Sequence, residues 1–93
     1  MATLLKVDGT KETVTPANPE TGFGLQELYK LLGVEMIEVI HTDDGILVFD
    51  EEGKFRQPNA LNEAATALLH KAGGMPFDYM VGNVLICNEK EFQ

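Results

Sequence analysis

The stretch that decides the fold runs from Asn59 to Asn88 and reads NALNEAATALLHKAGGMPFDYMVGNVLICN. Its first half is rich in Ala and Leu at helical spacing, and a pair of glycines, Gly73-Gly74, ends the pattern. Its second half, 79–87, is the most apolar run of the chain and indicates a strand. The two halves predict a helix packed on a strand, which together form the core for the other elements.

Two positions in this stretch carry local signals. Asn62 is the predicted N-cap of the helix, with Glu63 in the first turn favouring the helix dipole, and an earlier start capped by Asn59 is the alternative. Gly82 interrupts the apolar strand, which indicates a bulge or a close approach of another part of the backbone.

The segment before this stretch predicts an antiparallel meander. A strand over 35–42 leads through the turn 43–45 into a strand over 46–49, which is apolar on both faces and is therefore expected inside the sheet. A second turn at 51–53 is followed by a short predicted strand over 54–56.

The first third of the chain predicts a hairpin and a helix. Strands over 4–7 and 11–15 flank the turn signal Asp8-Gly9, and the weakly patterned second strand is expected at a sheet edge. A loop with Pro16 and Pro19 follows. The next helix is expected to begin at 21 or 22 and to end at Gly33. Its apolar face is formed by Leu25, Leu28, Tyr29 and Leu32.

These elements predict one α+β domain over 1–93, with 1–20 as an N-terminal hairpin and loop and 21–93 as the core. The expected order is ββ-α-βββ-α-β, with two helices packed on one face of a mainly antiparallel sheet. The other face would then stay open, carrying either Val39 and His41 or Met36 and Ile40. Because exposed apolar area of this kind marks an interface, we expect a homo-oligomer, most simply a dimer.

Composition excludes several classes of partner. The net charge of −8 over 93 residues argues against direct binding to nucleic acid or to an anionic membrane surface. A single cysteine, Cys87, cannot form an internal disulfide, and neither a secretory signal nor an apolar run of membrane-spanning length is visible. We therefore expect a cytoplasmic protein.

Several spaced residues resemble a known family. They are the Leu-rich helix with Gly33, Ile37-Glu38-Val39, Asp50-Glu51-Glu52-Gly53-Lys54, Asn62 with Ala65, and Val81-Gly82-Asn83-Val84-Leu85-Ile86. Over about 25–92 this pattern resembles the family known as domain of unknown function 3846, met in phages, plasmids and bacterial genomes. The resemblance implies a phage or mobile-element setting and marks Gly53, Asn62, Ala65 and Gly82; it implies no activity.

The sequence offers no catalytic or cofactor set. The histidines His41 and His70 stand apart, no Cys-x-x-Cys pair exists, and no phosphate-binding loop is present. Cys87 lies in the most apolar strand, where a thiol is usually an inert core residue. We therefore expect no metal, no cofactor and no enzymatic activity.

Five residues are candidates for ligand binding. On a strand, Lys54 and Arg56 would point to one side and could meet phosphate, although a solvated edge strand is the alternative. Tyr79, or Phe55, could stack on a base. The amides of Asn62 and Asn83 could read the edge of that base, although a helix cap and a solvent-facing amide are the alternatives.

The sequence thus favours a small non-enzymatic binding protein of phage or mobile-element type. Its expected ligand is a small nucleotide-derived signal, which it would sequester to counter host defence. The alternative is an acidic decoy, or another protein-protein inhibitor, that occupies a host nucleic-acid enzyme. Its acidic residues would be those of two turns, Asp43, Asp44, Asp50, Glu51 and Glu52.

Overall fold

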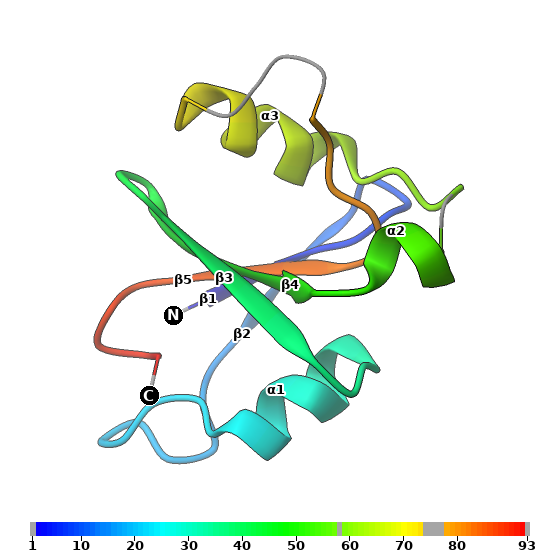
Figure 1. The fold of residues 1–93 in the computed structure, drawn as a ribbon. Coiled ribbons are helices and arrows are strands. Elements are labelled where there is room, and N and C mark those ends of the chain that lie inside the picture. The colour runs from blue at the N-terminus through cyan, green and yellow to red at the C-terminus, as the bar shows by residue number, and fades with distance from the viewer. Residues whose placement is uncertain (1, 58, 74–77, 93) are drawn as a thin grey trace.

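The computed structural model describes residues 2–57, 59–73 and 78–92. Within these ranges the elements are β1 (Ala2–Leu5), β2 (Lys11–Val14), α1 (Leu25–Leu32), β3 (Ile37–Thr42), β4 (Gly45–Asp50), α2 (Gly53–Arg56), α3 (Glu63–Lys71) and β5 (Val84–Cys87). The strands form one antiparallel sheet, and the predicted α+β class is confirmed (Figure 1).

The sheet has the strand order β2-β1-β5-β4-β3. As predicted, β2 lies at an edge and β4 lies inside the sheet. The register of β3 and β4 pairs Thr42 with Gly45, so the two residues of the hairpin loop are Asp43 and Asp44. The N-terminal hairpin has a longer loop, 6–10, in which the carboxylate of Asp8 accepts hydrogen bonds from Thr10.

The prediction that both helices pack on one face is wrong. Helix α1 and helix α3 lie on opposite faces of the sheet, as Figure 1 shows. The reason is that the inner strands are apolar on both faces. On β4, Ile46 and Val48 pack on the α1 side, whereas Leu47 packs on the α3 side. Each face of the sheet thus carries a helix, so the inference of an oligomer from one uncovered face loses its basis, and the homo-oligomer stays a prediction.

The predicted strand over 54–56 is also wrong, because these residues form the short helix α2. Strand β4 already pairs with β3 on one side and β5 on the other, so it has no edge left for a further hairpin strand. The chain turns helically instead, and the amide of Gln57 donates to the carbonyl of Gly53 at 2.7 Å. Gly53 permits this turn, since a Cβ there would lie 2.9 Å from Cγ2 of Val81.

Asn62 caps α3 as predicted, and the alternative start at Asn59 is wrong. Its Oδ1 accepts from the amide of Ala65 at 3.0 Å. Its Nδ2 donates to the carbonyl of Leu5 at 2.9 Å and to that of Gly82 at 2.8 Å. The side chain has no exposed surface, so one buried amide joins α3, β1 and the segment that leads into β5.

The last strand begins at Val84 rather than at residue 79. Gly82 has a φ of +74°, and a Cβ there would lie 3.1 Å from Nε2 of Gln57. Residues 80–82 pair locally with 60–62, through hydrogen bonds from Asn62 N to Met80 O and from Gly82 N to Ala60 O, both 2.8 Å. Gly82 is therefore a close-approach position at which the regular strand is interrupted.

Helix α1 begins at Leu25, three or four residues later than the expected start at 21 or 22. The delay follows from Gly22, whose φ of +83° is not helical. The helix ends at Gly33 with a φ of +69°, as predicted. Among the described residues, no helix combines the length and hydrophobicity that crossing a membrane requires.

Candidate functional site

A cavity of about 300 Å³ opens beside α2, on the face of the sheet that α3 covers. It lies at the end of the β3–β4 hairpin that is away from the loop 43–44, next to α2 and the segment 78–81. The lining residues are Glu38, Ile40, Phe49, Asp50, Glu51, Lys54, Phe55, Leu69, Asp78, Tyr79, Met80 and Val81.

The floor of the cavity comes from β3 and β4. Glu38 is the register partner of Phe49, so their side chains share one face of the sheet. Ile40 lies two residues further along β3 on that same face, and Glu51 follows directly after the end of β4 at Asp50. Both Glu38 and Glu51 line the cavity, and the amide of Glu51 donates to the carbonyl of Met36 at 3.3 Å, which holds residue 51 beside the start of β3.

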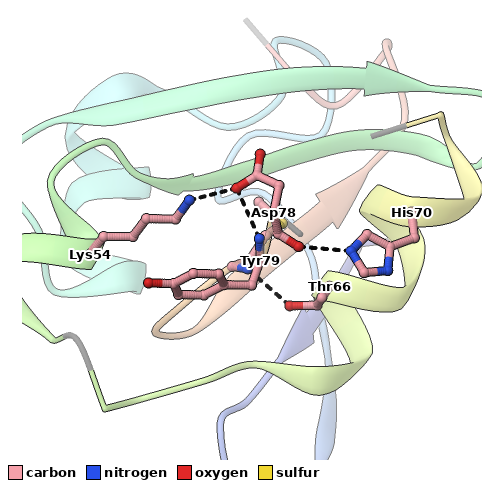
Figure 2. A network of polar contacts seen from close by, with 6 residues as sticks. Lys54, Thr66, His70, Asp78 and Tyr79 are labelled. Carbon is pink, nitrogen blue, oxygen red and sulfur yellow. Dashed lines mark hydrogen bonds and ion pairs between the residues drawn. The ribbon is translucent and has the colours of Figure 1, made fainter. Parts of the chain in front are cut away.

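One wall is an ammonium group held by a carboxylate and an aromatic ring (Figure 2). The Nζ of Lys54 lies 2.6 Å from Oδ1 of Asp78 and 4.5 Å from the centroid of the Tyr79 ring. The same Oδ1 accepts from the amide of Tyr79 at 2.9 Å. The hydrogen bond from Lys54, and then that from the Tyr79 amide, lower the pKa of Asp78 below its usual 3.8.

Helix α3 fixes the backbone of this wall. Nε2 of His70 lies 2.7 Å from the carbonyl oxygen of Asp78, and the amide of Met80 donates to Oγ1 of Thr66 at 2.9 Å (Figure 2). These bonds tie 78–80 to two successive turns of the helix. The wall is thus positioned by the same helix that Asn62 caps.

The described lining combines exposed aromatic surface with excess negative charge. Phe55 is 88% exposed and Tyr79 is 39% exposed, so both rings are available at the rim. Four carboxylates and one ammonium group line the cavity, which leaves a net charge of −3 on the described lining residues. An aromatic and acidic cavity is suited to a ligand that carries both an apolar body and a positive charge.

The structure brings two of the five predicted residues together, Lys54 and Tyr79. Arg56 lies elsewhere: its Nη1 donates to Oδ2 of Asp50 at 3.2 Å, and it lines a second, polar pocket with Glu35, Met36 and Glu52. The anion patch of Lys54 and Arg56 was inferred from a strand. On a helical turn, residues two apart point in nearly opposite directions, so the pair does not form.

The two asparagines lie outside the cavity. Asn62 is fully buried, and its amide is used by the three bonds that hold α3, β1 and Gly82 together. Oδ1 of Asn83 accepts from the amide of Val7 at 3.1 Å, on the side of the N-terminal hairpin. Neither side chain lines the cavity.

Sequence reasoning missed Glu38, Phe49 and Asp78 as parts of the site. Glu38 did carry a signal, because a carboxylate that shares a strand face with Ile40 interrupts an otherwise apolar stripe. Asp78 carried no local signal, since its role depends on Lys54, which lies 24 residues earlier in the chain.

The other chemical candidates are engaged in the fold. Asp50 is buried with Arg56, and Asp44 pairs with Lys71 at 3.2 Å, so two of the five carboxylates proposed for a decoy surface already hold cations. Burial raises the pKa of the Cys87 thiol to about 11. No group of three potential metal ligands occurs in the part of the chain that the structure describes.

A comparison with protein families matches the model of domain of unknown function 3846 (DUF3846) over residues 1–93. The match includes the N-terminal hairpin, which the sequence resemblance left out. No curated protein and no solved structure matches the chain significantly. Over its whole length, from the β1–β2 hairpin to β5, the chain belongs to the DUF3846 family.

Proposed function

We propose that the protein is a non-catalytic binding protein whose cavity beside α2 holds a small ligand. The observation that carries the proposal is the rim of that cavity. Phe55 exposes 88% of its surface there, next to the half-exposed Tyr79 and above a floor that contains Phe49. Exposed aromatic rings around a concave site are typical of ligand recognition, and a volume of about 300 Å³ is that of a small-molecule site.

The setting we propose is the cytoplasm of a bacterium, where a phage-encoded or plasmid-encoded protein would act by sequestering its ligand to counter host defence. The family resemblance supports the mobile-element part of this proposal. Sequestration needs a pocket and no catalytic group. The buried thiol of Cys87, which is predominantly protonated at neutral pH, packs on the α1 side of the sheet and does not line the cavity.

A nucleotide-derived signal stays a prediction for the identity of the ligand. In its favour, Lys54 and Tyr79 offer one ammonium group and one ring face. Against it, the Lys54 ammonium is already bound to Asp78 at 2.6 Å, and Arg56 lies outside the cavity. The decoy alternative has weaker support, since Asp50 is buried and cannot contribute to a surface array of carboxylates.

The test is a thermal-shift screen with small molecules of every charge class: nucleotides, organic acids, amines and neutral compounds. A ligand at about 100 times its Kd stabilises the native state by about 2.7 kcal/mol, which raises the Tm of a domain this size by roughly 10–20 °C. We expect at least one class to do so.

The matched variants are Phe55→Ala and Leu25→Ala. Both remove a largely exposed apolar side chain, but Leu25 lies at the start of α1 on the opposite face of the sheet. Stabilisation by the ligand should decline in Phe55→Ala and persist in Leu25→Ala. The proposal is refuted if no class stabilises the wild-type protein, or if the two variants respond alike.

A further inference from the structure

We infer that the cavity takes a small organic cation, an ammonium or guanidinium group on an apolar body. This inference rests on the proposed function, because it names the ligand class of the same cavity. It departs from the phosphate-bearing ligand that the sequence favours. Three features of the cavity carry it: two carboxylates that have no partner among the described residues, a bound ammonium group of the protein itself, and a small volume.

The two carboxylates are those of Glu38 and Glu51. Both residues are exposed, both line the cavity, and no other described residue forms a hydrogen bond or ion pair with either carboxylate. Glu38 is the register partner of Phe49, and Glu51 follows directly after β4, where its amide donates to the carbonyl of Met36 at 3.3 Å. Like charges that line one cavity of about 300 Å³ repel one another, and a cation bound in that cavity reduces this repulsion.

The contacts of Lys54 show which chemical group Asp78 and Tyr79 bind. Its ammonium group lies 2.6 Å from a carboxylate oxygen of Asp78 and 4.5 Å from the centroid of Tyr79 (Figure 2). A carboxylate and an aromatic face are the two partners that stabilise an organic cation. The wall therefore already binds an ammonium group, and Glu38, Glu51 and Phe55 offer the same chemistry to a second one.

Volume and charge both disfavour a large anion. A cavity of about 300 Å³ stands at the lower end of the range of about 300–1,000 Å³ for ligand sites. A short aliphatic amine fits that space, whereas a cyclic oligonucleotide extends beyond it. The described lining residues carry a net charge of −3, so a phosphate in the cavity would be repelled electrostatically.

The substitution Lys54→Gln should change the affinities for the two ligand classes in opposite directions. Removing the ammonium group makes the cavity more negative and frees Asp78 and Tyr79, so a cation should bind at least about threefold more tightly. A phosphate-bearing ligand would lose its single ammonium partner and bind more weakly. Lys90→Gln is the matched control, because Lys90 is exposed, does not line the cavity and changes the net charge equally.

The measurement is isothermal titration calorimetry with putrescine, spermidine and agmatine, with butanediol as a neutral probe and ADP-ribose as an anionic one. Ionic strength is kept near 0.15 M, where a Debye length of about 8 Å screens diffuse attraction to an acidic protein. Glu38→Gln with Glu51→Gln is compared with Glu20→Gln with Glu89→Gln, whose residues are exposed and lie outside the cavity. Both double variants change the net charge by the same amount.

We expect at least one amine to bind, with affinity reduced at least about tenfold in the first double variant and less than about twofold in the second. Equal losses in the two double variants would overturn the inference, because the attraction would then be diffuse. The inference also fails if Lys54→Gln weakens amine binding, or if ADP-ribose or butanediol binds through Phe55 while the amines do not. If only ADP-ribose or butanediol binds through Phe55, the proposed binding function stands and the cationic ligand class is wrong. If no ligand binds through Phe55, both the proposed function and the ligand class are wrong.

Discussion

Replacing Asn62 by alanine should destabilise the fold more than replacing any exposed polar residue. The change removes the N-cap of α3 and leaves the carbonyls of Leu5 and Gly82 without their donor. Loss of the cap costs about 1 kcal/mol, and each buried carbonyl without a partner costs about 1 kcal/mol or more. The free energy of unfolding should therefore fall by roughly 3 kcal/mol, a large part of the ~5–15 kcal/mol typical of a domain.

Equilibrium urea unfolding measures this loss. With a slope of about 1–3 kcal/mol/M, the midpoint should fall by about 1 M or more. Asn59→Ala is the matched control, since Asn59 is exposed and caps no helix, and its effect should stay within about 0.5 kcal/mol. A loss below about 1 kcal/mol for Asn62→Ala would refute the reasoning that one buried amide joins three elements.

Asn62→Asp separates the cap from the two donors. A carboxylate can still accept from the amide of Ala65, but it cannot donate to Leu5 and Gly82 and instead turns negative charge toward their carbonyl oxygens. This variant should be at least as unstable as Asn62→Ala at neutral pH. Stability close to that of the wild type would mean that the cap alone accounts for the role of Asn62.

Three further predictions concern single sites. Gly82→Val should lower stability by about 1–3 kcal/mol in urea unfolding, because the φ of +74° and the contact with Gln57 both oppose a branched side chain; a stabilised variant would contradict this. Because Lys54 lowers the pKa of Asp78, the stability that ionised Asp78 contributes is present above pH 3.8 and is lost as the pH falls through the lowered pKa. The stability difference between wild type and Asp78→Asn should therefore close in that acid range, and a difference unchanged down to about pH 2 would speak against the pair. The thiol of Cys87, with its pKa raised to about 11, should react with a disulfide reagent at about pH 8 only as fast as the protein unfolds, so immediate labelling of the native protein would rule out its burial.

Local signals in the sequence predicted the ends of elements well. Gly33 ends α1 and Asn62 begins α3, because a left-handed residue and an N-cap are local requirements that few residue types satisfy. Gly82 likewise predicted a break in the last strand, and its φ of +74° explains why the regular strand starts only at Val84.

The errors came from tertiary context. The alternation of Lys54, Phe55 and Arg56 is that of a strand, but β4 has a partner on each side and no free edge for another one. The sequence already showed that 46–49 is apolar on both faces. Such a strand requires a packed layer on each face of the sheet, rather than two helices on the same face.

The candidate site was predicted only in part for the same reason. Lys54 and Tyr79 were chosen for their chemistry, and the fold brings them together. Glu38 and Phe49 come from two other strands, and Asp78, although it directly precedes Tyr79, acquires its role only through Lys54, 24 residues earlier in the chain. A cavity built at the junction of five segments has no short motif, so its acidic character becomes visible only in the folded protein.

The central claim is that a small ligand binds in the cavity beside α2, and amide NMR during a titration with agmatine tests it most directly. The account predicts saturable shifts that concentrate at 38–40, 49–55 and 78–81, the segments that line the cavity. Shifts should stay small in the hairpin loop 6–10, on the side of the molecule where Asn83 binds Val7. Shifts centred on the acidic Asp43–Asp44 turn, or spread over all exposed carboxylates without saturating, would contradict the claim.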